Sequence, residues 1–323
     1  MITGATGFLG AEIVTHARAA GWRVRALVRN PQPQARLVET LVGDLDDSVA
    51  LRRACEGASA VVHAAGLAHV VGARARDFAS FNLVNEVGTD KVVSAALEAG
   101  VPHIVLISSV SVYGSHGGAQ CDETAPCNPQ GPYATSKWRG ELIAAERAKG
   151  RASLTILRFA TIYGEGDRGN VARLIGAIDR GHFIWPGSGL NRKCLIFKED
   201  AARACLKALE CPSPGTEIFN VSAEPATVKE IVSAICQALG RPVPGLRIPP
   251  VLLNVADAVS RTLGDPGQIS HRIQKFVRDD VYSRSKFENI YHFCPKVTLS
   301  EGLQREVRFL RRGEICGPVT LSL

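Results

Sequence analysis

Short apolar runs alternate with longer segments of helical periodicity through the first half of this 323-residue chain. The apolar runs that fit strands are residues 22–28, 58–66, 103–114 and 153–164. The segments between them fit helices over residues 8–21, 81–100 and 133–147, and residues 43–57 fit a loop leading into a further helix. Such alternation predicts an α/β fold, in which helices cover both faces of a doubly wound parallel sheet. Ligands bind beyond the carboxyl ends of the strands in sheets of this kind.

The first strand of that sheet has very little chain from which to form. Only Met1, Ile2 and Thr3 precede the first glycine of the opening stretch "MITGATGFLG". We predict that Ile2 and Thr3 nevertheless pair within the parallel sheet. A strand this short buries little surface, so its edge is expected to fray, and its brevity suggests that the native start lies upstream.

Three glycines follow this strand at a regular spacing, as Gly4-x-x-Gly7-x-x-Gly10. Gly4 suits a tight turn, Gly7 lets the backbone approach a diphosphate, and Gly10 allows the next helix to pack closely on the strand. That helix would present free N–H groups and the positive end of its dipole to the phosphates. The spacing differs by one residue from the usual G-x-G-x-x-G motif, so a turn without a ligand is the alternative. A strand and a helix in the correct order favour the dinucleotide site.

The regular alternation ends at about Gly164. Beyond it the loops lengthen, prolines cluster in "RPVPGLRIPP", and the helical pattern of residues 227–240 stands alone. We therefore predict a dinucleotide-binding domain over residues 1–165 and a smaller substrate-binding lobe, made mainly of residues 166–323, that covers the sheet edge. The segment "EIFNVS", residues 217–222, is expected to return to the main sheet as a strand.

The net charge of +7 is spread along the chain instead of being gathered in one basic tract. Its densest run, "REVRFLRRGE", has helical spacing and is interpreted as the solvated face of a helix near the C-terminus. This distribution argues against nucleic acid as a partner and favours attraction of an anionic small molecule. Nine cysteines without a C-x-x-C pair and eight dispersed histidines predict a reduced protein without a structural metal.

No segment of the sequence has the length and apolarity expected of a transmembrane helix. The most apolar late stretch, "IPPVLLNVADAVSRTLG", is interrupted by two prolines, by Asn254 and by Asp257. It is not expected to span a bilayer, although a peripheral membrane contact or a dimer contact stays open for it. The N-terminus lacks the basic start and apolar block of a signal peptide, which predicts a cytoplasmic location.

The stretch "GPYATSKWRGE" carries the most specific chemical signal. Tyr133 and Lys137 are four residues apart and therefore share one face of a helix. A phenol titrates near pH ~10, but a neighbouring ammonium and the positive ring of an oxidised nicotinamide both favour phenolate and lower its pKa. Tyr133 can then exchange a hydroxyl proton as a hydride moves. Ser109, at the end of a predicted strand, can hydrogen-bond the same substrate oxygen. The alternative is a Tyr and a Lys on a solvated helix face.

Several motifs together resemble the extended short-chain dehydrogenase/reductase family and, within it, the NAD-dependent epimerase/dehydratase group. They are the three glycines, "HAAG", "NEVGT", "SSVSVYG" and "YATSK", with later support from "LRFATIYGEGD", "NRKCLIFKEDAARA" and "EIFNVSA". The resemblance covers most of the chain and implies a Rossmann-type fold with a smaller C-terminal substrate-binding lobe. It also implies that Ser109, Tyr133 and Lys137 are the catalytic set, and that Asn85 is a structural asparagine near Lys137.

The resemblance places cofactor-binding residues at the carboxyl ends of the strands. The implied set is Gly4, Thr6, Gly7, Phe8, Leu9, Gly10, Arg29, Asp44, Leu45, Ala64, Ala65, Gly66, Tyr133 and Lys137. Relatives that use NAD often end the second strand with an acid that binds the ribose hydroxyls, whereas this chain has Arg29. A guanidinium suits a 2′-phosphate, so NADP is favoured over NAD, with a solvated arginine as the alternative. Asp44 lies where relatives contact the adenine, and its alternative role is a helix N-cap.

Substrate-binding residues are implied in both parts of the chain: Ser109, Ser111, Arg168, Arg192 and Lys193. Arginine binds a diphosphate in a planar fork, but each of the three cations is equally well explained as a surface charge. The choice between Arg192 and Lys193 depends on a one-residue shift in alignment. Dehydratases of the group carry an adjacent Asp-Glu pair where this chain has Val110 and Ser111, which argues against dehydration.

We predict an NAD(P)-dependent nucleotide-sugar epimerase that transfers hydride at sugar C4. An NADPH-dependent 4-keto nucleotide-sugar reductase would use the same catalytic residues and is the first alternative. A hydroxysteroid or flavonoid-like ketone reductase and a non-catalytic nucleotide sensor are further alternatives, although a sensor would have no need of the tyrosine and lysine. The sequence names neither the sugar nor the nucleotide, and it leaves open a homodimer through paired helices, an arrangement common in the family.

Overall fold

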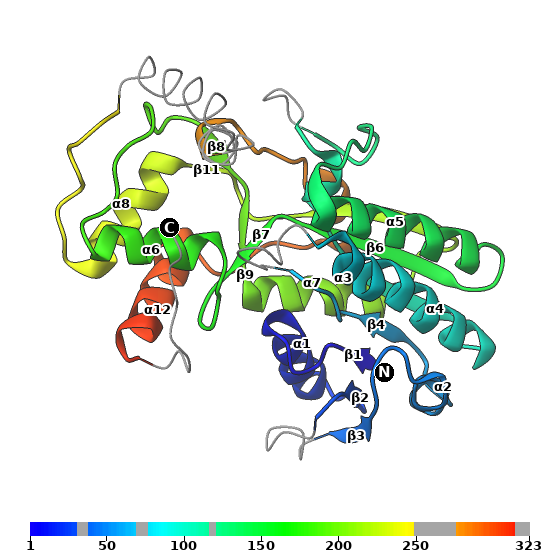
Figure 1. The fold of residues 1–323 in the computed structure, drawn as a ribbon. Coiled ribbons are helices and arrows are strands. Elements are labelled where there is room, and N and C mark those ends of the chain that lie inside the picture. Colours follow the sequence, from blue (N-terminus) through cyan, green and yellow to red (C-terminus); the bar gives the residue numbers. More distant parts are fainter. Residues whose placement is uncertain (31–37, 69–76, 116–120, 249–275, 314–323) are drawn as a thin grey trace.

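A computed structural model describes residues 1–30, 38–68, 77–115, 121–248 and 276–313 (Figure 1). Seven strands form one sheet in the order β10-β6-β5-β4-β1-β2-β3, and every neighbouring pair is parallel. This is the doubly wound α/β fold predicted from the alternation. The strands are β1 (Ile2–Thr3), β2 (Arg25–Val28), β3 (Glu39–Val42), β4 (Val61–His63), β5 (His103–Ser109), β6 (Ser153–Phe159) and β10 (Thr216–Val221).

Helices cover both faces of this sheet (Figure 1). On one face α1 (Phe8–Ala19) packs against α7 (Lys198–Glu210), and α11 (Ser285–Tyr291) lies beside β10. On the other face lie α2 (Ser48–Cys55), α4 (Gly88–Glu98) and α5 (Gly131–Ala148). Each face therefore has its own apolar core. Burial of both faces explains why the strands appear in the sequence as nearly continuous apolar runs and not as alternating ones.

Ile2 and Thr3 form the central strand, as predicted. They pair in parallel with β2 on one side and β4 on the other, and both residues are buried. The hydrogen bonding extends one residue further, because the Met1 amino group donates to the Ala60 carbonyl at 2.9 Å and the Val62 N–H donates to the Met1 carbonyl. Two residues thus suffice for a strand when a partner strand lies on each side.

Three of the predicted strands end earlier than expected, and the one predicted at 58–66 is reduced to β4. Residues 103–114 are β5 followed by a 3₁₀ turn over Val110–Tyr113, because the Ser109 side chain accepts a hydrogen bond from the Ser111 N–H and caps that turn. Residues 153–164 divide into β6 and β7 (Thr161–Tyr163), and β7 leaves the main sheet to pair with β9 (Leu195–Phe197).

The helix predicted over residues 81–100 is continuous but not regular. It consists of α3 (Phe78–Phe81), a π-helical segment over Asn82–Val87, and α4. The strand predicted at 22–28 is shorter than expected, since β2 begins at Arg25. The helix predicted from Tyr133 is confirmed as α5, which begins two residues earlier at Gly131.

A further apolar core lies beyond Gly164, where α6 (Asn170–Asp179), α8 (Val228–Leu239) and α12 (Leu299–Arg311) pack together. Two small sheets accompany it, β7 with β9 and β8 (Arg192–Lys193) with β11 (Ala226–Thr227). The chain between them returns to the main sheet through α7 and β10, which confirms the strand expected at 217–222. The domain boundary at residue 165 stays a prediction.

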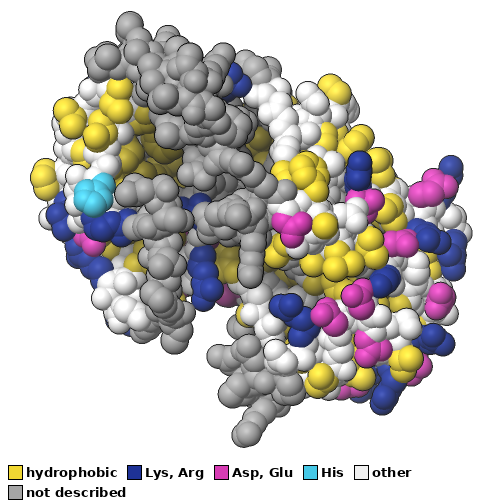
Figure 2. Space-filling view, viewed as in Figure 1, with side chains coloured by type: hydrophobic (Ala, Val, Ile, Leu, Met, Phe, Trp, Pro, Cys, Tyr) yellow, Lys and Arg dark blue, Asp and Glu magenta, His cyan; other side chains and the backbone are white. Residues whose placement is uncertain are grey.

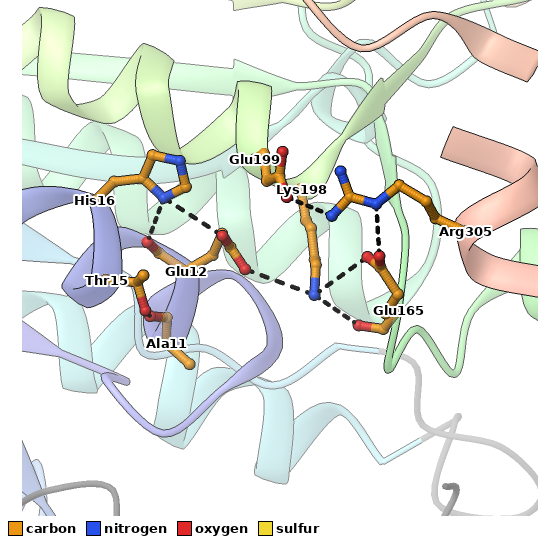
Figure 3. A network of polar contacts seen from close by, with 8 residues as sticks. All are labelled: Ala11, Glu12, Thr15, His16, Glu165, Lys198, Glu199 and Arg305. Carbon is orange, nitrogen blue, oxygen red and sulfur yellow. Dashed lines mark hydrogen bonds and ion pairs between the residues drawn. The ribbon is translucent and has the colours of Figure 1, made fainter. Parts of the chain in front are cut away.

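An ion-pair network joins the two parts of the molecule (Figure 3). Lys198 Nζ, at the start of α7, lies 3.5 Å from the Glu12 carboxylate on α1 and 3.4 Å from the Glu165 carboxylate after β7. Arg305 on α12 donates from Nε to Glu165 at 2.7 Å and from a second nitrogen to Glu199. Burial acts to raise the pKa of Glu165, but these two cations outweigh it and hold the pKa below its ordinary value.

The basic run "REVRFLRRGE", predicted as the solvated face of a helix, is therefore only partly exposed to solvent. Helix α12 carries Arg305 into this network and buries Leu303, Glu306 and Val307. On the face seen in Figure 2, Lys and Arg side chains are interspersed with Asp and Glu, which agrees with a dispersed charge. No helix in the described ranges is both long and apolar enough to cross a bilayer. The apolar segment considered for a membrane or dimer contact falls, apart from its first residue, outside the described residues.

Glu306 is a carboxyl group whose burial opposes its ionisation. Its side chain is fully buried, and neither carboxyl oxygen makes a well-formed hydrogen bond with a described residue. Burial and the nearby Asp167 carboxylate raise its pKa from 4.5 to about 9. The folded protein therefore holds a proton that the unfolded chain releases near pH 4.5, and folding stability falls as the pH rises between these two values.

Replacing Glu306 by Gln is expected to stabilise the protein at alkaline pH, because the amide keeps the shape and removes the titration. The free energy of unfolding at pH 8 should rise by about 1–3 kcal/mol, with little change at pH 4.5. Thermal unfolding across this pH range measures the difference. Glu301→Gln, on the exposed side of the same helix, is the matched control and should show no such trend. A Glu306→Gln gain that is independent of pH would contradict the assignment.

Candidate active site

The glycine loop is formed by close contacts that exclude larger residues. Gly4 has a φ of 68°, and a Cβ there would lie 2.5 Å from the Ala65 nitrogen after β4. A Cβ on Gly10 would lie 2.0 Å from the Gly4 carbonyl oxygen. Both distances are shorter than any real contact. The structure thus bears out the sequence-based reasons for glycine at the turn and at the helix–strand contact.

The N-terminus of α1 fits a diphosphate. Gly7 is its N-cap residue, no side chain caps the helix, and its first turn carries no acidic residue. Thr6 and Gly7 are exposed, and Phe8 and Leu9 are half-buried. The Gly7 N–H donates to the Gly4 carbonyl at 2.9 Å, whereas no side chain caps the N–H groups of the first helical turn, which leaves them available to a bound dinucleotide diphosphate.

The remaining residues of the predicted cofactor set lie at the carboxyl ends of β2, β3 and β4. Arg29 is exposed directly after β2. Asp44 accepts a hydrogen bond from the Leu45 N–H at 2.7 Å, while Asp47 caps α2 by accepting from the Ala50 N–H at 2.9 Å. The alternative role of Asp44 as a helix cap is therefore wrong. Beyond β4 the loop residues Ala64, Ala65 and Gly66 complete the set.

Asn85 fixes the loop that follows β4. Its amide oxygen accepts from the Leu67 N–H at 2.7 Å, and its Nδ2 donates to the Leu67 carbonyl and to the Ser136 hydroxyl, each at 3.0 Å. The π-helical segment carries it into this position, a common use of such segments at functional sites. Gly140 allows the close approach of α5, because a Cβ there would lie 2.6 Å from the Asn85 carbonyl oxygen.

A buried histidine connects this asparagine to the central strand, and the sequence reasoning missed it. Thr89 Oγ1 donates to the Asn85 carbonyl, so it accepts from His63 Nε2 at 3.1 Å. His63 Nδ1 is then the acceptor for Thr3 Oγ1 at 2.7 Å, and Thr3 in turn accepts from the Ala65 N–H. Burial and the charge of Lys137 lower the pKa of His63 to about 3, so its ring is neutral. It serves as a fixed connector and not as a base.

Ser109, Tyr133 and Lys137 come together at the carboxyl end of β5. Pro132 lies in the first turn of α5, where its fixed φ suits a helix start. The ring of Phe81 meets Tyr133 edge-on, with centroids 6.1 Å apart. Lys137 is buried, and its Nζ donates to the Ile107 carbonyl. These contacts place the three side chains as the spacing of "YATSK" predicts.

The electrostatics of the pair differ in part from the expectation. Burial raises the pKa of Tyr133, and its hydrogen bond with Ser109 opposes that change without reversing it. Burial lowers the pKa of Lys137 to about 8, and the Glu141 carboxylate opposes this. The phenol is therefore protonated at neutral pH, because burial is the dominant influence on its pKa.

The substrate-side residues have different environments. Ser111 Oγ is buried and makes no hydrogen bond with a described residue, so it offers an unused donor beside Ser109. Arg168 is exposed in the loop before α6, and Arg192 is exposed on β8. Lys193 is half-buried and pairs with Asp280 at 2.6 Å. Of the two neighbouring candidates, Arg192 therefore has the less neutralised charge.

The family model described as "NAD dependent epimerase/dehydratase family" matches residues 1–222. The chain belongs to this family and is an NAD(P)-dependent enzyme of the extended short-chain dehydrogenase/reductase type, as the motifs predicted. Its relatives and structural neighbours include nucleotide-sugar 4-epimerases that bind NAD.

Three similar proteins cover nearly the whole chain. The N-acetyl-alpha-D-glucosaminyl-diphospho-ditrans,octacis-undecaprenol 4-epimerase of Escherichia coli O157:H7 is 30% identical, over 96% of this chain and 94% of its own length. The 2-alkyl-3-oxoalkanoate reductase of Stenotrophomonas maltophilia (strain K279a) is 28% identical, over 94% and 97%. The solved structure of MoeE5 in complex with UDP-glucose and NAD is 28% identical over 97% and 98%, with a TM-score of 0.77.

Proposed function

We propose that the protein is a 4-epimerase that acts on a hexose carried by a nucleoside diphosphate, through reversible hydride transfer at sugar C4. One observation carries the proposal: Ser109, Tyr133 and Lys137 meet at the end of β5, beside a helix N-terminus that has no internal cap. Structural relatives with UDP-glucose and NAD bound, such as MoeE5, support a sugar nucleotide and a nicotinamide at one site.

In this proposal Tyr133 exchanges the proton of the C4 hydroxyl. When bound, an oxidised nicotinamide would supply a reversible hydride acceptor and a positive charge that favours phenolate. Ser109 hydrogen-bonds the C4 oxygen and holds it near the phenol. Lys137 donates to the ribose and keeps positive charge close to Tyr133. Ser111 Oγ, buried and without a partner among the described residues, is suited to a sugar hydroxyl.

The diphosphate needs cationic partners, and we assign Arg168 and Arg192 to it ahead of Lys193, whose charge is offset by Asp280. The absence of an acid pair at Val110 and Ser111 leaves no group to eliminate water, so dehydration is not proposed. Arg29 supports NADP over NAD, because a guanidinium at the end of β2 suits a 2′-phosphate.

A sugar diphosphate linked to a polyprenol is a second candidate substrate. The 4-epimerase of Escherichia coli O157:H7 acts, by its name, on a sugar diphosphate joined to undecaprenol, and it matches this chain almost from end to end. The reacting sugar and the diphosphate are common to both substrates. A polyprenyl-linked N-acetylhexosamine is therefore our second candidate, with the carrier as the difference to be tested.

Two further expectations from the sequence stay predictions. The cytoplasmic location is one. The other is a homodimer through paired helices. It is supported by exposed apolar side chains on this helical surface, namely Phe78 on α3, Leu83 on the π-helical segment and Leu142 on α5. Sedimentation analysis of the purified protein tests the dimer directly.

Replacing Tyr133 by Phe removes the proton shuttle but keeps the ring and its contact with Phe81. Cofactor should still bind, while turnover falls by roughly 10²–10⁴-fold. Lys137→Ala should impair both, because this side chain serves both steps. Fluorescence titration with NAD(P)H and single-turnover kinetics separate the two effects. Near-normal turnover in Tyr133→Phe would exclude this mechanism.

Arg29→Asp tests cofactor choice. If the guanidinium binds a 2′-phosphate, its charge-assisted hydrogen bond contributes about 1.5–3 kcal/mol, or roughly ten- to a hundredfold in affinity. The variant should lose affinity for NADP(H) far more than for NAD(H), measured by calorimetric titration of both cofactors. An equal loss for both, or no loss, would show that Arg29 is only a solvated charge.

The substrate experiment comes first in practice. The enzyme, without added cofactor, is incubated separately with UDP-glucose, UDP-N-acetylglucosamine and N-acetylglucosaminyl-diphospho-polyprenol, and the sugars are analysed for C4 epimers. An epimerase regenerates its cofactor in each cycle, so product should form from at least one. Conversion of the polyprenyl compound alone selects the second candidate. If none changes and a 4-keto nucleotide sugar instead drives stoichiometric NADPH oxidation, the protein is a reductase.

A further inference from the structure

A buried ion pair lies one helical turn below the catalytic lysine. Arg158 on β6 donates from Nε to both carboxylate oxygens of Glu141 at 3.1 Å, and from a second nitrogen at 2.6 Å. The two side chains are only 5% and 3% exposed. Charged side chains are almost never buried this deeply unless they are paired, and Arg158 lies within an otherwise apolar strand. The pair has no place in the proton and hydride steps above.

The pair is part of a polar row across the sheet. Ser108 on β5, Arg158 on β6 and Asn220 on β10 are register partners and therefore share one face. Ser108 Oγ donates to Glu141, so the row is joined to α5. At the other side the Arg158 guanidinium lies 4.8 Å from the ring centroid of Tyr113, whose hydroxyl donates to Asn220 at 2.8 Å.

This row is attached to the catalytic residues from two directions. Glu141 follows Lys137 by four residues on α5, so both lie on the same side of the helix. Ser108 precedes Ser109, and Ile107 accepts the hydrogen bond from Lys137 Nζ. The ion pair thus fixes β5 and α5 to each other at the level of the reacting groups.

We propose that Glu141 and Arg158 are positioning residues for Lys137: the carboxylate keeps the buried lysine an ammonium, and the guanidinium holds the carboxylate in place. This rests on the proposed role of Lys137 as the ammonium that binds the cofactor ribose. Other titratable groups around Lys137 are the neutral His63 on β4, the phenol of Tyr133 on α5 and, beyond Glu141, Arg158 on β6. Of the groups named here, Glu141 is the one that carries a negative charge and can therefore favour the ammonium form of Lys137.

The direction of the effect follows from the surroundings. Burial lowers the pKa of Lys137 to about 8, and the Glu141 charge acts against burial. Residues four apart on a helix have Cβ atoms about 5–6 Å apart, and at an effective dielectric of about 20 a charge about 6–10 Å away shifts a neighbouring pKa by about 1–2 units. Without Glu141, Lys137 would lose its proton at or below neutral pH. The ion pair therefore keeps the lysine charged in the range where the enzyme works.

A purely structural role is the competing explanation, and the energetics make it weak. A buried ion pair contributes little net stability, and apolar residues of similar volume often replace one without loss. Removing one partner alone is damaging because the other is left buried and unpaired. The informative variant is therefore the double replacement Glu141→Leu/Arg158→Met, which removes both charges, with Glu141→Gln as the single change that keeps the side-chain shape.

The readout is the affinity for NAD(P)H as a function of pH, measured by fluorescence without substrate. Binding by the unaltered protein should weaken as Lys137 loses its proton near pH 8. In the double variant and in Glu141→Gln the midpoint should fall by about 1–2 pH units, which means roughly three- to 25-fold weaker binding at pH 7.5. Circular dichroism and thermal unfolding verify that each variant is folded.

Three comparisons make the result specific. Arg158→Lys keeps both charges and should keep the midpoint. Arg147→Gln removes a charge from the solvent side of α5, where it pairs with Asp90, and should also leave the midpoint unchanged. Lys137→Met should abolish the transition; if it persists, the role assigned to Lys137 is wrong, whichever sugar is the substrate. A folded double variant with the original midpoint would overturn the proposal for Glu141 and Arg158.

Discussion

The contact between α1 and the central strand is the constraint on which the site depends. The backbone at Gly10 lies so close to the Gly4 carbonyl, and the backbone at Gly4 so close to Ala65, that no side chain fits at either glycine. This approach sets the helix N-terminus directly above β1 and beside the loop after β4. The uncapped N–H groups are thereby aimed at the edge where the strands end. A larger residue at Gly4 or Gly10 would displace the helix, the β4 loop or both.

Polar groups under this edge fix the other side of the site. A series of hydrogen bonds through Thr3, His63 and Thr89 leads from β1 to the carbonyl of Asn85. The Asn85 side chain in turn holds the β4 loop and contacts Ser136 on α5. Each member is buried and each uses its available donor or acceptor. The glycine contacts and this relay act on the same loop, one from α1 and one from the π-helical segment. The loop after β4 is consequently held by contacts from both sides, as a preorganised cofactor site would require.

The sequence predicted the features that depend on local spacing. Strand and helix alternation, the glycine pattern and the four-residue interval between Tyr133 and Lys137 each require only neighbouring residues to be interpreted. Even the two-residue strand β1 could be anticipated, because the glycines that follow it need a strand to end there. The substrate side was less predictable, since Arg168, Arg192 and Lys193 are separated by loops whose course is not encoded in a periodic pattern.

What escaped prediction involves partners that are distant along the chain. His63 looked like part of an apolar strand, and its role depends on Thr3 and Thr89. The π-helical segment carries Asn85 to hydrogen bonds with Leu67, a partner 18 residues away that helix propensity does not reveal. Burial also opposes one expectation, because the pKa of Tyr133 is raised even though Lys137 lies one turn away. A sequence gives the order of charges, whereas the local dielectric and the hydrogen-bond partners decide which charge acts on which group.

The pattern of buried charge shows how such a site can remain folded. Lys137, Glu141 and Arg158 are all buried, and their formal charges sum to one positive charge at the cofactor edge. The Arg158–Glu141 pair satisfies its own hydrogen bonds, so the positive charge of Lys137 is the one left without a carboxylate in direct contact among the described residues. That charge is held by a carbonyl, which leaves it able to interact with a ligand. Among the described residues, the apolar strands thus enclose the ammonium of Lys137 near the phenol of Tyr133, and this is the arrangement that the proposed proton exchange at Tyr133 would need.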